Sequence, residues 1–507
     1  MTALHNPRLV DFGCLVAGAS VPFAFAPFGW WWLAIFAPSV LIVSWLNVRP
    51  KRAFRRGWLF GCGMFGVGVS WVQVSIHQFG LPVLAFSLLI TIVFVAFVAL
   101  YPAVLGGLWC RFLRGSITEK VHISALLAVA PGWVLTEWLR GWLVLGFPWL
   151  SLGYSQLGTP AAGLAPVFGV FGVSAVVMLS SALIVGLYVL RGKARIRIVV
   201  SLLVIWGGAA LVAEHEWGRP IGESVSVAMV QGNIPQAVKW LPEQRQPTLD
   251  LYRDLSEVHW GKELIVWPET AIPALPGQIS PFIAALAERA RRSGTTLLSG
   301  ILTNDGQQHY NSLLAIGAIQ RHYRKHHLVP FGEYLPAAVA LRPILEALGV
   351  TVSEFSRGPK MQMLLEVAGY PIGTSICYEA VFSEEIIRPL PDAAWLVNVS
   401  NDAWFGDSLA PHQHLEIAQM RSLETARYMV RSTNTGISAV IDARGEIMAK
   451  SPQFQTDVLV ADVQPMVGAT LFVIVGNWLI VSLCAVAVLL VGVRSHCPRK
   501  GGDSVEL

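Results

Sequence analysis

The stretch EHEWGRP, residues 214–220, divides the sequence into two parts of different composition. Charged and turn-forming residues appear here abruptly, after a long and very apolar region. Beyond it, short β-branched runs alternate with stretches of helical spacing, which is typical of a layered α/β domain. The stretch therefore predicts a helical membrane region before residue 214 and an α/β domain after it.

The regions on either side of that domain are too apolar for an ordinary water-soluble protein. The 507-residue chain is 54% hydrophobic and only 14% charged, and its mean hydropathy is +0.55. Spanning a bilayer takes about 20 apolar residues in a helix. Candidate spans lie at 12–48, 57–110, 164–190, 198–213 and 467–493. We expect much of the chain to lie in lipid.

Clusters of Lys and Arg predict how these segments are oriented, because short positive loops stay on the cytoplasmic side. Such clusters lie at 49–56, 111–120, 191–197 and 494–500. If all of them are cytoplasmic, an even number of crossings separates each from the next, which predicts about eight spans. An alternative with about seven spans leaves 198–213 in the membrane interface and places the α/β domain inside the cell. We favour the first arrangement because the alternative strands a positive cluster outside.

The favoured arrangement gives the chain four parts. They are a membrane domain of about seven spans at 1–213, an extracytoplasmic α/β domain at 214–466, a transmembrane helix at 467–493 and a cytoplasmic tail at 494–507. The N-terminal segment lacks a small-residue cleavage site and is therefore interpreted as a retained span. The net charge of +5 is accounted for by the basic loops and implies no nucleic-acid partner.

The α/β domain contains runs that predict individual strands and helices. The predicted strands lie at 224–232, 263–269, 295–302, 310–318, 370–379, 393–401, 436–442 and 457–463. The predicted helices lie at 249–260, 282–294 and 414–430. Several strand runs are apolar throughout, which favours strands covered on both faces.

Cys377 is the only cysteine between residues 214 and 466, so it has no disulfide partner in its own domain. A thiol attacks as the thiolate and therefore needs a base or a cation nearby. Glu269 and Lys325 also follow predicted strands, and Glu333 lies eight residues after Lys325. Each residue alone has a structural explanation, as core filler, turn carboxylate or lipid-facing charge. Spacing alone does not bring them together.

The motifs around these residues resemble those of a known family. PET (268–270), YRKHHLVPFGEYLP (323–336) and CYEAVF (377–382) are similar, in this order, to the Glu, Lys and Cys motifs of the nitrilase superfamily. The strings MVQGNIPQAVKW (229–240), NVSNDAWFGDS (398–408) and RSTNTGISAVIDARG (431–445), together with the membrane segments, narrow the resemblance to the apolipoprotein N-acyltransferase family. It covers essentially the whole chain. It implies a polytopic α-helical membrane bundle that carries a nitrilase-like αββα sandwich domain.

The resemblance implies a role for each residue of a catalytic triad. Glu269 would be the general base, Cys377 the nucleophile and Lys325 the cation that stabilises the oxyanion. The family's reaction moves a fatty acyl chain from a membrane phospholipid, usually phosphatidylethanolamine, to the N-terminal amine of S-diacylglyceryl-cysteine in an apolipoprotein. The acyl chain passes through a cysteine thioester, which predicts ping-pong kinetics. The resemblance also implies the bacterial inner membrane, with the catalytic domain on its periplasmic face.

Four further residues match the family's motifs. Glu333 would orient Lys325 or the attacking amine, the Tyr378 N–H would help to hold the oxyanion, and Glu379 would fix the turn around the nucleophile. Trp240 would pack along an acyl chain, although an ordinary buried tryptophan explains it equally well. The apolar loops at 403–407 and 328–336 are candidates for touching lipid.

No metal site and no cofactor are predicted. His326 and His327 are adjacent and His412 and His414 alternate, without the cysteine or carboxylate pattern typical of zinc. A glycine-rich loop that could hold a phosphate is not found either.

In the membrane region, Glu137 and Arg140 lie three residues apart on a predicted helix and could form a structural ion pair. Tryptophans are also frequent here and are typical of interfacial anchors; they are Trp30, Trp31, Trp32, Trp138, Trp142 and Trp149.

Two other functions compete with acyl transfer. In a membrane-tethered nitrilase-type amidohydrolase, water and not an amine would resolve the thioester. A transporter or scaffold would only bind lipoprotein, and Cys377→Ala would leave its function intact.

Overall fold

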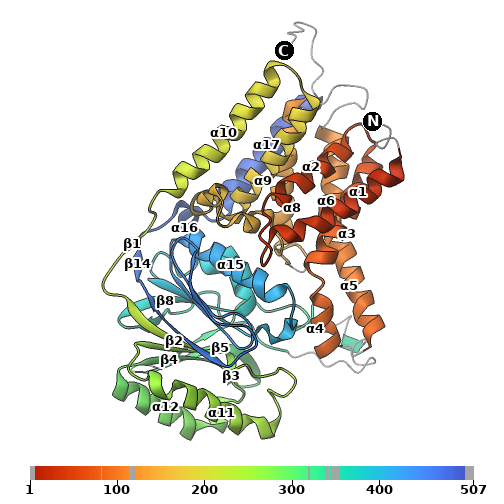
Figure 1. Ribbon diagram of the computed structural model, residues 1–507. Helices are drawn as coiled ribbons and strands as arrows, with labels where there is room; N and C mark the ends of the chain where they lie inside the picture. The colour runs from red at the N-terminus through yellow and green to blue at the C-terminus, as the bar shows by residue number, and fades with distance from the viewer. Residues whose placement is uncertain are drawn as a thin grey trace. The chain divides into compact units, whose positions relative to one another are not determined.

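The computed structural model describes residues 6–80, 83–113, 122–144, 146–317, 320–336, 338, 342–343 and 354–496 (Figure 1). The chain divides into two compact units. The helical unit comprises residues 1–73, 85–215 and 475–507, and the α/β unit comprises residues 74–84 and 216–474. One boundary therefore lies within the EHEWGRP stretch, where the composition changes.

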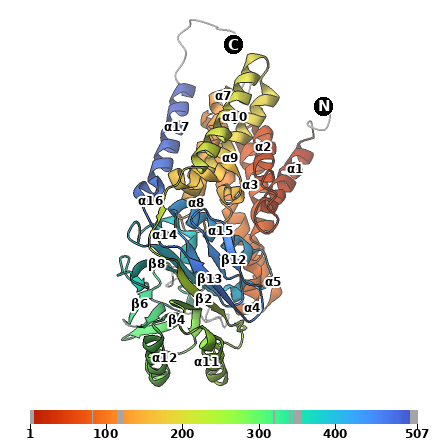
Figure 2. The ribbon, with the colours of Figure 1, turned by 60° about the vertical axis from the view of Figure 1, so that its left-hand side comes forward.

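The helical unit is built from a set of longer helices (Figures 1 and 2). These helices are α1 (Pro7–Ser20), α2 (Leu33–Trp45), α3 (Pro50–Gly68), α5 (Leu84–Val98), α6 (Leu100–Leu108), α8 (Val129–Arg140), α9 (Ala165–Val189), α10 (Lys193–Ala213) and α17 (Trp478–His496). Short helical turns and loops connect them.

Three helical segments are long and apolar enough to cross a bilayer, namely Leu84–Leu113, Pro160–Val189 and Lys193–Ala213. Helices α3 and α4 (Val72–Phe79), bent by 57°, make a fourth if they count as one span. This count covers the described residues only, and residues 114–120 and 497–500 of the predicted basic clusters lie outside them. The structure thus has three or four candidate spans, and the expectation of about eight crossings stays a prediction.

Burial separates a central helix from a peripheral one. In the most apolar part of Pro160–Val189, 78% of the residues are buried, against 11% in α10. Leu203, Val204 and Leu211 of α10 are 66–78% exposed. Such a continuous apolar surface is unfavourable in water and favourable in hydrocarbon. We infer that α10 faces lipid.

Glu137 and Arg140 on α8 are both 3% exposed and attract each other electrostatically, and each also hydrogen-bonds to other groups. Glu137 Oε1 accepts hydrogen bonds from Trp133 Nε1 and from the Leu152 N–H, both at 2.8 Å. The Arg140 guanidinium donates to the Trp149 carbonyl. Both side chains therefore tie the loop after α8 to the helix, because buried polar groups are stabilised by whichever partners satisfy them.

The prediction that Trp149 is an interfacial anchor is wrong, because its side chain is only 2% exposed. Its ring packs against Trp71 at 5.1 Å and Phe147 at 5.9 Å, inside the bundle. Trp30 and Trp142, by contrast, are 52% and 55% exposed, as an interfacial position requires.

The α/β unit contains two six-stranded sheets of mixed strand direction. The first has the order β13-β2-β3-β4-β5-β6 and the second β12-β11-β10-β9-β8-β7. The strands of the first sheet are β2 (Val225–Gln231), β3 (Leu264–Ile272), β4 (Thr296–Asp305), β5 (Gln308–Ile316), β6 (Arg321–Arg324) and β13 (Asp457–Val463). Those of the second are β7 (Leu365–Val367), β8 (Tyr370–Ile376), β9 (Trp395–Ser400), β10 (Met429–Thr433), β11 (Ala439–Ile441) and β12 (Ile447–Lys450). Strands β2, β3 and β4 are parallel in one sheet, and β8, β9 and β10 in the other.

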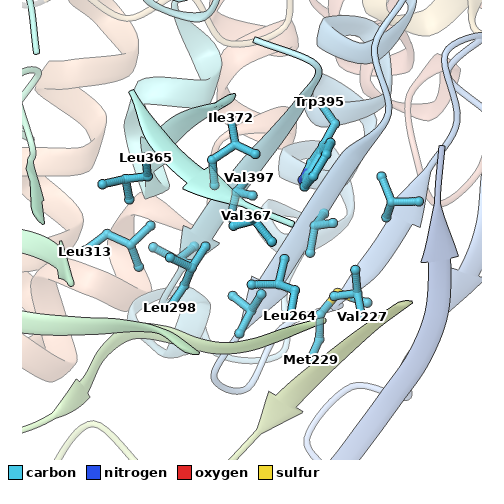
Figure 3. Close-up of a cluster of buried hydrophobic side chains, with 14 of the residues drawn as sticks. Val227, Met229, Leu264, Leu298, Leu313, Leu365, Val367, Ile372, Trp395 and Val397 are labelled. Carbon is cyan, nitrogen blue, oxygen red and sulfur yellow. The ribbon is translucent and has the colours of Figure 1, made fainter. Parts of the chain in front are cut away.

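Three apolar layers hold these elements together. Side chains of both sheets, including Leu264 and Val397, meet in the central layer (Figure 3). A second layer joins the first sheet to α11 (Pro242–Ser256) and α12 (Ser280–Ser293), and a third joins the second sheet to α15 (Ala410–Thr425). The order is therefore helices, sheet, sheet, helix, which buries both faces of each sheet and explains the uniformly apolar strand runs.

Each predicted strand has a counterpart, with residue 318 outside the described residues. The predicted end of the helix at 414–430 is wrong. It stops at Thr425 because Ala426 has φ +51, and Met429–Thr433 instead pairs in parallel with β9. The strand predicted at 370–379 likewise ends at Ile376, where Cys377 also takes a positive φ.

Candidate active site

Cys377 directly follows strand β8 and begins a 3-10 turn, Cys377–Val381. Its φ of +51 is left-handed, a conformation that costs a residue with a side chain about 1 kcal/mol or more. Glu379 holds the turn from one side, because its Oε2 accepts a hydrogen bond from the Ile376 N–H at 2.7 Å. The Cys377 side chain is 7% exposed. The sequence thus places a nearly buried thiol on a strained turn at the end of a parallel strand.

Glu269 lies in β3, on the facing sheet, where the strand departs from regular pairing. The register with β4 shifts between Trp267 and Ile272, and Thr270 has φ +48. Gly300 of β4 makes room for this bulge, because a Cβ there would lie 2.3 Å from the Pro268 oxygen and 2.6 Å from the Glu269 Cα. Bulges of this kind re-aim side chains near functional sites.

Glu269, Asn311, Lys325 and Glu333 form one connected group, which we call the acid–base cluster. Lys325 Nζ lies 2.8 Å from Glu333 Oε1 and 3.5 Å from Glu269 Oε1. Asn311 Nδ2 donates to Glu269 Oε1 at 2.7 Å and to Glu333 Oε1 at 3.1 Å. Lys325 is 1% exposed and Glu269 is 6% exposed. A buried ammonium is thus held between two carboxylates, with Asn311 bridging them.

The second sheet also contacts this cluster. Glu269 Oε2 accepts a hydrogen bond at 2.8 Å from the backbone N–H of Asn401, which follows β9. Both carboxylate oxygens of Glu269 are therefore fixed by donors. The carboxyl ends of β3, β8 and β9 meet here, and such strand ends are the usual location of active sites in parallel sheets.

Charge and burial set the resting protonation of Lys325 and Cys377. Burial alone would lower the pKa of Lys325, but Glu333 and Glu269 outweigh it and raise the pKa well above its usual range. Burial raises the pKa of the Cys377 thiol, Glu269 raises it further and Lys325 opposes both, so the thiol stays protonated at neutral pH. A group that reacts from this state needs a base to remove its proton during attack.

Glu379 is fully buried and accepts hydrogen bonds from both strand-end loops. Its Oε1 accepts from the His326 N–H at 2.7 Å, the His327 N–H at 3.0 Å and the Tyr323 hydroxyl at 2.9 Å. Burial raises the pKa of Glu379 to about 7, although these donors favour the carboxylate. The residue therefore ties the turn of Cys377 to the loop that follows Lys325.

Tyr378 shares its peptide group with Cys377, and its ring is fixed by aromatic packing. The ring lies 5.1 Å from that of Phe382 and 6.0 Å from that of His327. His327 in turn stacks on Phe382 at 3.7 Å. This packing restrains the turn that follows strand β8.

Trp240 is 45% exposed, which excludes an ordinary buried tryptophan. The preceding residue, Lys239, is instead 2% exposed and anchors the loop. Its Nζ donates to the Glu269 carbonyl at 3.2 Å and to Thr270 Oγ1 at 2.6 Å. Burial lowers the pKa of Lys239 to about 8, against the Glu269 charge.

The apolar loops near the site carry exposed aromatic side chains. Trp404 is 37% exposed and Phe331 is 49% exposed. Helix α4, as part of the α/β unit, holds the Trp404 loop: Ser75 Oγ donates to the Trp404 carbonyl at 2.7 Å, and the Phe79 ring lies 4.8 Å from the indole. Residues 74–84 and the Trp404 loop thus pack together within the α/β unit.

Within the described part of the chain, no group of three His, Cys, Asp or Glu side chains could hold a metal ion. His326 Nδ1 lies 2.8 Å from the Gly358 carbonyl, and the His327 ring stacks on Phe382. His414 pairs with Asp402 at 3.1 Å.

Sequence reasoning missed Asn311 and Lys239. Asn311 lies in a strand whose following residues are mostly apolar. A polar side chain at such a position is a signal of a functional site that the sequence offered. Lys239 precedes Trp240 in a quoted motif, but nothing in the sequence indicates that its ammonium is buried against the backbone of Glu269.

The chain was compared with protein families, with known proteins and with solved structures. The apolipoprotein N-acyltransferase N-terminal domain matches residues 17–183, and the carbon-nitrogen hydrolase family matches residues 226–471. A solved CN-hydrolase superfamily protein from Xanthomonas campestris is 18% identical with a TM-score of 0.37, covering 48% of this chain and 91% of that chain. The apolipoprotein N-acyltransferase of Methylococcus capsulatus is 44% identical over 93% of both chains. That of Photobacterium profundum is 41% identical over 91% of this chain and 90% of its own. The chain therefore belongs to the apolipoprotein N-acyltransferase family.

Proposed function

We propose that the protein transfers a fatty acyl chain from a membrane phospholipid to the N-terminal amine of S-diacylglyceryl-cysteine in apolipoproteins. The donor we propose is phosphatidylethanolamine, through its sn-1 ester. Membership of an acyltransferase family supports this reaction, and the geometry around Cys377 supports its route through a thioester.

In the first half of the reaction, Glu269 takes the proton of the Cys377 thiol as sulfur attacks the ester carbonyl. Lys325 and the Tyr378 N–H stabilise the negative charge that develops on the carbonyl oxygen. When the ester C–O bond breaks, the proton passes from Glu269 to the departing lysophospholipid alkoxide. The products are a lysophospholipid and an acyl thioester on Cys377.

In the second half, the free amine of the lipoprotein attacks the thioester carbonyl, and Glu269 accepts one of its protons. The C–S bond then breaks, the proton returns to sulfur and an amide is released. Glu333 keeps Lys325 charged and in place through both halves, while Glu379 keeps the turn of Cys377 fixed. Exposed Trp240 contacts the acyl chain.

One observation carries this proposal: the buried Lys325 ammonium lies 3.5 Å from the Glu269 carboxylate, and both charges act on the Cys377 thiol. A core cysteine with no chemical role does not require two buried charges of opposite sign beside it, since burying charges is costly.

We further propose that the enzyme is a multi-pass protein of the bacterial inner membrane with about eight spans. Residues 214–466 form the catalytic domain on the periplasmic face, between a membrane domain at 1–213 and a transmembrane helix at 467–493. The segment 494–507 is cytoplasmic. The loops around Trp404 and Phe331 contact lipid, which suits two substrates embedded in the same bilayer.

Mass spectrometry of the peptide that carries Cys377, after incubation with phosphatidylethanolamine, tests the function. We expect a mass increase of one acyl chain, which persists until a diacylated lipopeptide is added and is then lost to it. Steady release of free fatty acid without lipopeptide would favour the amidohydrolase. Full function of Cys377→Ala would favour a scaffold.

A further inference from the structure

A second group of buried charged side chains lies near Cys377 and takes no part in the proton transfers above. It consists of Asp402, His414 and Arg431, which we call the elbow cluster, and each is 0–1% exposed. Arg431 lies 3.0 Å from Asp402 Oδ2, and His414 Nδ1 lies 3.1 Å from Asp402 Oδ1. Three ionisable groups so deeply buried call for an explanation.

One hydrogen-bond contact links the cluster to the backbone of Cys377. His414 Nε2 lies 3.2 Å from the backbone carbonyl oxygen of Cys377. This carbonyl belongs to the residue whose φ of +51 forms the strained turn. Positive φ in a residue with a side chain persists only where surrounding contacts hold it. His414 supplies such a contact.

The contact between His414 and the Cys377 carbonyl also determines the direction of the Tyr378 N–H. The Cys377 carbonyl and the Tyr378 N–H belong to the same peptide group, which is planar and normally trans. In a trans peptide the two point in opposite directions, so a donor that fixes the carbonyl fixes the N–H. Hydrogen bonding to the carbonyl also polarises the peptide and strengthens its N–H as a donor.

We propose that His414 is a positioning residue, which holds the Cys377 carbonyl so that the Tyr378 N–H is directed at the oxyanion. The inference rests on the proposed acyl transfer, because it assigns the orientation of one of its two oxyanion donors. His414 touches neither substrate nor the reacting atoms; it acts through the peptide.

The rest of the cluster keeps the His414 ring in place. Burial alone would raise the pKa of Asp402, but Arg431 and His414 outweigh it and hold the pKa well below its usual range. Asp402 is therefore a carboxylate, which also accepts from Ser400 Oγ at 2.8 Å. A Cβ at Gly436 would lie 2.4 Å from Asp402 Oδ2, so only glycine fits beside this carboxylate.

Both ring nitrogens of His414 face acceptors, namely Asp402 and the Cys377 carbonyl, so both contacts are hydrogen bonds only when each nitrogen carries a proton. Burial and the Arg431 charge lower the pKa of His414, while Asp402 and the carbonyl oppose this shift. The second proton is thus released more readily than in a free histidine. One proton on Nε2 is enough to keep the hydrogen bond to the Cys377 carbonyl.

Two amide variants separate the contacts of the ring. In His414→Gln the amide nitrogen lies near the position of Nε2 and can still donate to the carbonyl, whereas in His414→Asn it lies near Nδ1 and cannot. The experiment uses the full-length protein in detergent micelles that contain phosphatidylethanolamine. It measures the single-turnover rate of thioester formation, the rate of Cys377 alkylation by iodoacetamide and the melting temperature.

We expect thioester formation in His414→Asn to be about 10- to 100-fold slower than in the wild type, and that in His414→Gln to stay within about 3-fold. Alkylation needs the thiolate but no oxyanion donor, so its rate should change by less than about 3-fold in both variants.

Equal rates of thioester formation in the two variants would overturn the inference. It would also be overturned if the alkylation rate fell as much as thioester formation, or if both variants unfolded. These results would make His414 a residue of the core. A wild-type protein that forms no thioester would overturn the proposed function together with the inference. A thioester in the wild type with equal variants would overturn the inference alone.

Discussion

The acid–base cluster and the elbow cluster both lie near Cys377 and use buried charge in different ways. In the acid–base cluster, Glu269 Oε1 is shared by Asn311 at 2.7 Å and Lys325 at 3.5 Å. Because two donors share this oxygen, Glu269 can lose the hydrogen bond from one of them when its carboxylate takes up a proton. In the elbow cluster, Asp402 divides its oxygens between His414 and Arg431. Charges that change during a reaction thus come from one sheet, and charges that hold a direction come from the other.

The largest effect should come from Cys377→Ala, which removes the atom that both clusters serve. We expect acyl transfer to fall by at least about 10⁴-fold, since no other group can form the thioester. Transfer of labelled acyl chains to a diacylated lipopeptide measures this. The melting temperature should change little because alanine fits a site that is nearly buried, and retained transfer would contradict the proposed nucleophile.

Lys325→Met should have the next largest effect, because it leaves Glu269 and Glu333 facing each other without a cation. We expect thioester formation to slow by about 10³-fold and the folded state to lose roughly 3 kcal/mol or more. Single-turnover assays and thermal unfolding measure the two effects. Lys360→Met, at an exposed position in the same unit, is the control. A similar loss in that control would show that the assay does not report on the cluster.

Asn311→Leu should have an intermediate effect, because it keeps the approximate volume but removes the donor that bridges Glu269 and Glu333. Hydrogen bonds to charged groups contribute about 1.5–3 kcal/mol, so we expect a loss of about 10- to 100-fold in thioester formation. Single-turnover kinetics check this. Unchanged kinetics would mean that Asn401 and Lys325 alone orient the general base.

Lys239→Met should act on stability more than on catalysis, and in a pH-dependent way. The folded pKa of Lys239 is about 8, below its ordinary value of 10.5. Between these values the unfolded chain binds the proton and the folded chain does not, so stability rises with pH in this window and is unaffected below it. From about pH 8 to about pH 9.5, the wild type should gain roughly 1 kcal/mol or more relative to the variant. Melting temperatures across this range test the sign, and a falling difference would contradict it.

Trp240→Ala should have the smallest effect on stability, within about 0.5 kcal/mol, because the side chain is 45% exposed. The apparent KM for phosphatidylethanolamine should nevertheless rise by about 3-fold or more, since an indole covers more of an acyl chain than a methyl group does. Steady-state kinetics measure this. An unchanged KM would remove Trp240 from the substrate site.

Much of the α/β unit could be predicted from the sequence because its strands are uniformly apolar, and strands covered on both faces require this. Helix α15 was harder: its pattern continues past Thr425, and only the left-handed backbone of Ala426 ends it. Lys325, Glu269 and Cys377 could be named only through motifs, since they lie in strands or loops that are far apart in the chain.

The elbow cluster could not be predicted for a physical reason. Asp402, His414 and Arg431 follow or occupy three different elements, and each alone is compatible with an exposed polar residue. Their burial depends on how β9, β10 and α15 pack. In the helical unit, Glu137 and Arg140 have the spacing of an ion pair, yet both bond to the loop that folds back onto α8.

The raised pKa of the Cys377 thiol also affects how long the enzyme survives. Peroxides and other oxidants react with thiolates far faster than with thiols, and they need access to the sulfur. A side chain that is 7% exposed and protonated at rest offers neither. In the proposed reaction, the thiol is activated when substrate arrives beside Glu269, and between turnovers it is protected against oxidative inactivation.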